Sequence, residues 1–162
     1  MKKSIGILIV IALAFATNAS AQSSITKMQS LYMYNFIKNV QWSNVSDTYV
    51  VGVFAKDETV KEINAVLGSR DFNGKSIQVK KTTSATQASN CHMIYVSTSN
   101  AKNIKSMKGS KNILIVSERG QINNGASISF IVENAKLKFK INEAACKTAG
   151  LQVSKGLISL GV

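Results

Sequence analysis

Three continuous apolar runs of strand length constrain the fold more than any other feature of this sequence. They span residues 49–55, 91–97 and 112–117, and segments of helical or polar character separate them. Strands that are apolar on both faces are typical of parallel sheets covered by helices on each side. Alternation of strands and helices is the pattern of an α/β domain. The sequence therefore predicts a single α/β domain with a mostly parallel sheet flanked by helices.

The segments between these runs are expected to supply the covering helices. Residues 25–40 carry apolar side chains at spacings of three and four, which predicts a first helix buried on more than one side. A second helix follows Asp57, which can cap its start, and Gly68 ends it. Further along, the pattern predicts a turn at 73–74 and a short strand at 76–81. Residues 82–90 are expected to form a loop or a weak helix, and residues 100–108 a third helix.

The last third of the chain has a different pattern. Apolar and polar residues alternate over 128–132 and again over 137–141, and residues 133–135 form a turn between them. This pattern predicts an antiparallel hairpin with one buried face. A short helix at 143–148, closed by Gly150, and an apolar tail follow.

The first 21 residues have the pattern of an export signal. Two lysines precede an apolar stretch over residues 4–16, and Ala19-Ser20-Ala21 supplies the small residues of a cleavage site before Gln22. The apolar stretch is shorter than the roughly 20 residues that span a membrane. We therefore expect residues 1–21 to be removed, residues 22–162 to form one exported domain, and no segment to span the membrane.

Basic residues outnumber acidic ones by 20 to 8. Removal of the signal leaves 18 against 8, a formal net charge of +10. Such a charge favours anionic partners, but export and the presence of only two arginines argue against nucleic acid. A solvated surface explains most of the lysines. Lysines alternate along the outer face of the predicted hairpin, at Lys136, Lys138 and Lys140. Such a row of charges protects an exposed sheet edge from pairing with other chains, and an anion-binding site is the alternative.

Two cysteines, Cys91 and Cys146, lie in the exported part of the chain. Outside the cytoplasm an even number of cysteines suggests a disulfide. The opposing interpretation is two buried, unpaired thiols, because free cysteine packs like a small apolar residue. The residue pattern is compatible with both.

The sequence contains no recognisable catalytic or metal-binding set. His92 is the only histidine, and its neighbour Cys91 would point to the opposite face of a strand. Gly74-Lys75-Ser76 resembles the end of a phosphate loop, but it follows a helix and opens a strand, which is the reverse of that motif. No Gly-x-Ser-x-Gly elbow occurs, and one histidine with two cysteines lacks zinc-ligand spacing. We therefore predict a protein that is not an enzyme and has no cofactor or metal.

Taken together, the segments resemble the YfiR-like family of small periplasmic proteins. The resemblance covers nearly all of the chain after residue 21, and its blocks occur in the family's order. Ser43 stands where the family usually has proline, and Cys146 where a small apolar residue is common. The first matching blocks are the helix that ends in tryptophan (32–42), the turn and strand (72–79) and the Cys-led strand (91–96). The hairpin (128–141), the short helix (142–151) and the tail (153–160) complete the match.

The resemblance implies a periplasmic regulator. The best-known member of this family binds the periplasmic part of an inner-membrane diguanylate cyclase and holds it inactive, and other relatives look like partners of membrane sensor kinases. The resemblance therefore implies an inner-membrane signalling protein as the partner. A homodimer is a further assembly that the sequence allows.

Two sets of residues are candidates for binding. Apolar residues in a terminal segment either dock on the core or offer a patch to a partner. For the partner surface these residues are Leu157, Ile158 and Leu160, with Lys155 at the rim. The alternative function is a small-ligand module, in which Tyr32, Tyr34 and Trp42 would line a pocket.

Overall fold

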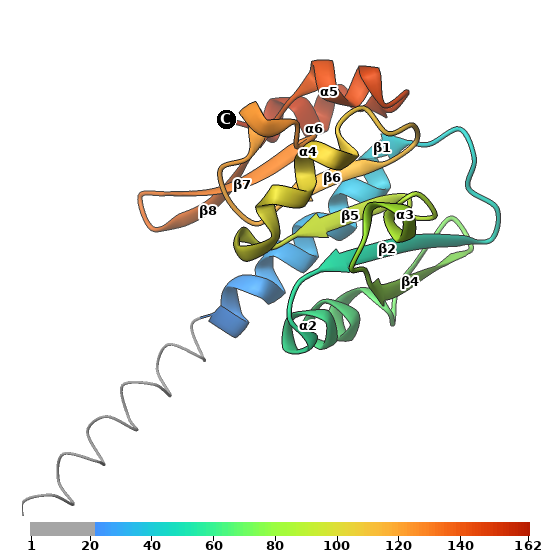
Figure 1. Cartoon of the computed structure of the whole chain (residues 1–162), viewed down its shortest axis with the longest axis horizontal. Helices are drawn as coiled ribbons and strands as arrows, with labels where there is room; N and C mark the ends of the chain where they lie inside the picture. Colours follow the sequence, from blue (N-terminus) through green and yellow to red (C-terminus); the bar gives the residue numbers. More distant parts are fainter. Residues whose placement is uncertain (1–21) are drawn as a thin grey trace, which may run out of the picture.

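The computed structural model describes residues 22–162 (Figure 1). The predicted signal segment, residues 1–21, lies outside the described residues. A first helix over residues 22–39 precedes the numbered elements. The strands are β1 Val40–Gln41, β2 Thr48–Phe54, β3 Asp71–Phe72, β4 Lys75–Lys81, β5 Met93–Val96, β6 Leu114–Ser117, β7 Ile128–Glu133, β8 Lys136–Ile141 and β9 Gln152–Val153. The helices are α2 Asp57–Leu67, α3 Ala85–Ala88, η1 Thr98–Asn103, α4 Ile104–Met107, η2 Ile122–Asn124, α5 Glu143–Thr148 and α6 Lys155–Leu160.

Within residues 22–162, seven strands form one main sheet in the order β3-β4-β2-β5-β6-β7-β8. The five central strands, from β4 to β7, run parallel, and the two edge strands, β3 and β8, are antiparallel to their neighbours. A small sheet pairs β1 with β9. The prediction of a mostly parallel sheet with a C-terminal antiparallel hairpin is confirmed.

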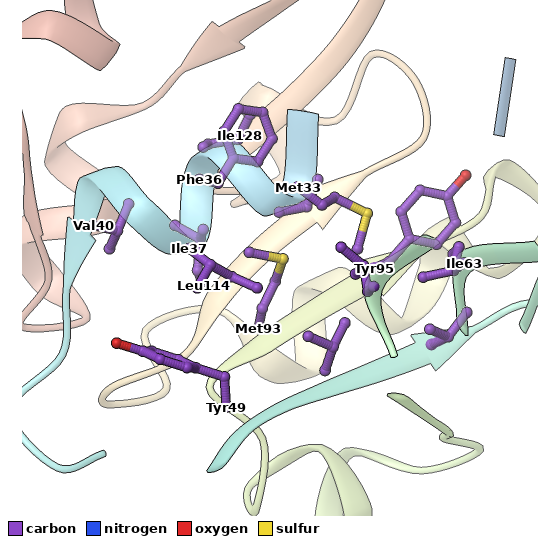
Figure 2. Close-up of a cluster of buried hydrophobic side chains, with 14 of the residues drawn as sticks. Met33, Phe36, Ile37, Val40, Tyr49, Ile63, Met93, Tyr95, Leu114 and Ile128 are labelled. Atoms are coloured by element: carbon purple, nitrogen blue, oxygen red, sulfur yellow. The ribbon is translucent and has the colours of Figure 1, made fainter. Parts of the chain in front are cut away.

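One face of the main sheet is covered by the first helix and by α2. The first helix contributes Met33, Phe36 and Ile37, each at most 1% exposed. They pack on side chains of the central strands such as Met93 and Leu114, as Figure 2 shows.

The buried residues of the first helix recur at spacings of three and four along one side, whereas Met28 and Leu31 on the opposite side are 45% and 46% exposed. The prediction that the helix is buried on more than one side is therefore wrong.

The other face is covered by the short helices α3 and α4. Ile94 and Val96 of β5 point to this side, whereas Met93 and Tyr95 point to the first helix. This alternation is the two-residue period of a strand that is buried on both faces. Gly52 of the neighbouring strand is required here, because a Cβ atom would lie 2.6 Å from the Ile94 side chain and the Thr82 hydroxyl.

The hairpin of β7 and β8 matches its prediction closely. Asn134 and Ala135 form the loop, with φ values of 51° and 57°. Positive φ at both positions is typical of the tight turns that suit the twist of a hairpin. β8 is an edge of the main sheet, so the lysine row on that strand lies where the sequence placed it. Lys138 pairs with Glu133 of β7, and this contact lowers the pKa of the Glu133 carboxyl.

Several element boundaries differ from the prediction. Asp57 is not the cap of α2; Lys56 occupies that position without a side-chain cap, and Asp57 lies in the first turn, where its charge favours the helix dipole. The expected helix at 100–108 is a 3-10 turn followed by the single turn of α4. The ambiguous segment 82–90 contains α3, capped by the Ser84 side chain. β1 and β9 were not anticipated, because two-residue strands carry no periodic pattern.

Candidate functional site

The C-terminal helix α6 is fixed to the end of the first helix. Ser154 caps α6, since its hydroxyl oxygen accepts a hydrogen bond from the Leu157 amide at 3.1 Å. The Ser154 amide donates to the Asn39 carbonyl oxygen at 2.9 Å, and its hydroxyl donates to Asn39 Oδ1 at 3.0 Å. The pairing of β1 with β9 lies directly beside this contact. The first residues of α6 therefore have a defined orientation on the domain.

The structure separates the four residues predicted to bind a partner. Leu157 is 2% exposed and belongs to the core cluster beneath α6, so it anchors the helix. Ile158 is half-buried, Lys155 is exposed, and Leu160 is 69% exposed. Three of the four thus remain accessible, and one is part of the core.

A groove lies beside α6 and extends the accessible apolar area. Its volume is about 260 Å³, and Ile158 forms one of its walls. Val162, 54% exposed, continues the apolar surface, and its amide donates to the Phe139 carbonyl oxygen of β8 at 3.0 Å. We define the α6 surface as Ile158, Leu160 and Val162 together with this groove. The other residues that line the groove are Glu143, Ala144, Cys146, Lys147, Leu151 and Val153.

The tyrosines proposed for a ligand pocket point to opposite edges of the main sheet. The Tyr32 hydroxyl donates to the Leu137 carbonyl oxygen of β8 at 3.3 Å, and its ring packs on the hairpin. The Tyr34 hydroxyl donates to the Asp71 carbonyl oxygen of β3 at 2.9 Å. Because β8 and β3 are the two edges of the sheet, these side chains do not share a pocket.

Trp42, the third residue of that set, belongs to a separate contact around His92. The Trp42 indole donates to the His92 carbonyl oxygen at 2.9 Å. His92 Nδ1 accepts from the Val50 amide at 2.9 Å, and Nε2 lies 3.0 Å from the Asn44 carbonyl oxygen. The imidazole thus holds the loop after β1 against β2. Because both ring nitrogens contact backbone groups, the presence of His92 at this position is explained by its structural role.

Cys91 and Cys146 lie on opposite sides of the main sheet. Cys91 belongs to the cluster under α3 and α4, and Cys146 to the cluster under the first helix. Both are buried free thiols in the described part of the chain. Of the two alternatives that the sequence allowed, the structure has the unpaired thiols.

Thiol labelling tests this arrangement. Burial raises the pKa of both thiols, that of Cys146 to about 11. A raised pKa means that the fold favours the neutral thiol, so this contribution to stability is fully present below a pH of about 8.5 and is lost as the pH rises towards 11. At pH 8 we expect a thiolate-specific reagent to label the native protein only at its rate of opening, and both thiols to react at once in denaturant.

The controls for labelling are the single variants Cys91→Ala and Cys146→Ala, which assign each reaction to one thiol. A mass measurement with and without reductant distinguishes slow labelling of free thiols from a disulfide. Immediate labelling of the native protein, or a two-dalton mass increase on reduction, would contradict the buried free thiols.

The N-terminal half of the first helix reaches the carboxyl ends of two of the parallel strands, β5 and β6. Open α/β sheets bind ligands at this edge. Here the Gln29 side chain donates to the Glu118 carbonyl oxygen just after β6 at 3.3 Å, and accepts from the Tyr95 hydroxyl of β5 at 2.9 Å. Gln29 is 2% exposed, and its helix neighbours Thr26 and Ser30 are also buried. The N-terminal half of the first helix therefore covers the carboxyl ends of β5 and β6.

Two further observations concern the residues that the structure describes. Between residues 22 and 162 no three His, Cys, Asp or Glu side chains are grouped so that they could hold a metal ion. Over the same residues, no helix combines the length and the apolar character needed to cross a membrane.

A comparison with models of known protein families gives a match over most of the chain. The model of the YfiR/HmsC-like family matches residues 26–162, which is most of the chain and includes the first helix, the main sheet and α6. None of the curated proteins compared with the chain is significantly similar to it. Because the match covers the whole described fold apart from its first four residues, the chain belongs to the YfiR/HmsC-like family.

Proposed function

We propose that the chain is a periplasmic regulator that binds the periplasmic part of an inner-membrane signalling protein and represses its output. The output enzyme would be a diguanylate cyclase or a sensor kinase. Membership of the YfiR/HmsC-like family supports this function. In this proposal residues 1–21 are a cleaved signal, residues 22–162 are the regulatory domain, and the chain acts by binding rather than by catalysis.

The observation that carries the proposal is the exposure of Leu160 on an anchored helix. A large apolar side chain that is 69% exposed contributes nothing to the core, yet Leu157 and Ser154 hold the helix that presents it. A pre-positioned apolar side chain binds a partner without the cost of ordering the segment first. Exposed apolar side chains that gather on one part of a surface commonly mark protein interaction sites.

The charges around the α6 surface indicate the character of the partner. Lys147 and Lys155 are exposed at its rim, and Glu143 is the acidic residue of the groove. A partner with an apolar centre and acidic residues around it would complement this arrangement. Rim charges of this kind raise the association rate and the selectivity more than the affinity.

Cross-linked capture from native membranes tests the proposal. Tagged protein carrying residues 22–162 is expected to retain a membrane protein with a periplasmic sensing domain and a cytoplasmic signalling domain. Leu160→Asp is expected to reduce the yield of that companion on the order of tenfold, because a carboxylate would be buried without a partner at the interface. Its melting temperature should equal that of the unmodified protein, since Leu160 is exposed.

The matched control is Val132→Asp, which places the same charge at a side chain 53% exposed near the turn of the β7–β8 hairpin and outside the residues of the α6 surface. It should leave capture unchanged. The output of the companion, measured as cyclic-di-GMP or as kinase activity, should rise with Leu160→Asp if the regulator represses. Equal loss of capture in both variants, or no signalling companion with folded bait, would contradict the proposal.

A further inference from the structure

A hollow lies at the amino edge of the main sheet, beside the starts of β6 and β7. Its volume is about 550 Å³, within the range of small-molecule sites. Three short segments enclose it: the turn between α4 and β6, the loop containing η2, and α5 (Figure 1). The residues that line it are Lys108, Gly109, Ser110, Ile113, Ile115, Ile122, Asn123, Gly125, Ser127, Asn142, Ala144, Ala145, Thr148 and Ala149.

Small residues keep this hollow open. The wall formed by α5 presents alanines at 144, 145 and 149, so no long side chain enters from that helix. Gly125, with φ at 105°, lets the Lys108 stem lie across the loop, because a Cβ atom there would be 2.8 Å from Lys108 Cγ. The volume therefore arises because small residues of three segments, which are separate in the sequence, come together in the fold.

The floor of the hollow is apolar, and the polar side chains of Ser127 and Asn142 at its wall already have hydrogen-bond partners. Ile113 and Ile115 are at most 3% exposed to solvent. The Ser127 hydroxyl oxygen accepts from the Ile115 amide at 3.2 Å. The Asn142 side chain accepts from the Ala145 amide at 2.9 Å and donates to the Ile122 carbonyl oxygen at 3.4 Å. An occupant would thus meet mainly hydrocarbon at depth.

Lys108 is the one charged residue among those that line the hollow. It takes part in neither ion pair of residues 22–162, which join Lys81 to Asp57 and Lys138 to Glu133. No carboxylate lines the hollow. Lys108 is exposed, so its positive charge borders an apolar cavity and favours a molecule with an acidic group at one end.

We propose that this hollow binds a small organic carboxylate with an apolar body, which lies on Ile113 and Ile115 while its acidic group faces Lys108. The site is distinct from the α6 surface, although Ala144 lines both this hollow and the groove beside α6. The proposal does not depend on partner binding, because it is tested on the isolated protein.

Titration by heteronuclear NMR tests the site with three probes of one chain length: octanoate, octan-1-ol and octylamine. Octanoate is expected to shift the amides of Gly109, Ile115, Gly125 and Ala145, which belong to the lining segments. Octan-1-ol should shift the same amides with weaker affinity, and octylamine should bind most weakly, because its charge repels that of Lys108.

Two substitutions, each with a matched control, locate the binding. Lys108→Gln should weaken octanoate about threefold to fivefold, the worth of one exposed charge pair, whereas Lys105→Gln, one turn away on α4, should not. Ala145→Phe fills the hollow and should weaken all three probes on the order of tenfold. Its control, Ala85→Phe on the exposed side of α3, should have no effect.

Three outcomes would overturn the proposal. Octanoate that causes no shifts up to its solubility limit shows that the hollow is not a site for this class. Shifts that centre on the α6 groove place binding elsewhere. Equal affinity for octanoate and octylamine, or an unchanged affinity in Lys108→Gln, removes the role of the acidic group. A melting temperature close to that of the unmodified protein is required for each variant, and Lys108→Gln provides the test if Ala145→Phe does not fold.

Discussion

Phe36→Ala is expected to lower the free energy of unfolding by about 3–5 kcal/mol, the usual cost of truncating a buried phenylalanine. Phe36 has no exposed surface and lies at the centre of an aromatic cluster. Its ring centroid is 5.1 Å from that of Phe139, 5.8 Å from Phe130 and 6.4 Å from Tyr32. Removing it leaves a cavity and three rings without their common contact. Chemical denaturation followed by circular dichroism measures the loss.

The control for Phe36→Ala is Phe72→Ala. Phe72 is half-buried on the edge strand β3 and packs on Tyr49 at 6.2 Å between ring centroids. Because water already reaches its ring, its truncation should cost less than half as much. Similar losses in the two variants would show that the first helix is not a principal part of the core.

Leu157→Ala is expected to cost about 2–5 kcal/mol, whereas Leu160→Ala three residues later should change stability by less than about 0.5 kcal/mol. The difference follows from exposure alone, since Leu157 is 2% and Leu160 is 69% exposed. Loss of the Leu157 side chain also frees α6 from the core, so this variant should bind a partner less well through disorder of the helix.

A comparison of the two leucine variants separates stability from binding. Leu160→Ala should reduce capture of the partner at unchanged stability. Leu157→Ala should reduce both, and at a temperature well below its melting point it should recover part of its binding. Equal stability of the two variants would contradict the docking of α6 through Leu157.

The sequence predicted those elements whose pattern is local. The continuous apolar runs identified β2, β5 and β6, and strict alternation identified β7 and β8 with their turn. The cap at Asp57 was wrong because capping depends on the backbone angles of one residue, and Lys56 takes the extended conformation instead. The helix expected at 100–108 became a 3-10 turn and one α-turn, since its polar residues give no apolar face to hold a longer helix.

The candidate site was predicted less completely, for physical reasons. All four tail residues were recognised as a group, but which leucine enters the core depends on the Ser154 cap and on the β1–β9 pairing, neither of which has a periodic signal. The larger hollow is formed by segments that are distant in sequence. The groove beside α6 lies within residues 143–158, but its shape depends on how α5, β9 and α6 pack together. Small residues such as Ala145 and Gly125 are the only features of the sequence that could have indicated the larger hollow. By themselves they show that a side chain is small, and they do not show that a cavity lies beside it.

The position of the first helix has a consequence for how this architecture could acquire new chemistry. In open α/β sheets the carboxyl edge is the place where loops can change freely and new reactions arise. Here Gln29 and its buried neighbours cover that edge at β5 and β6, and the same helix carries Phe36 of the core. Clearing the edge for a substrate would therefore require the loss of the element that stabilises the domain. The fold is thus better suited to diversify through its outer surfaces than through catalysis.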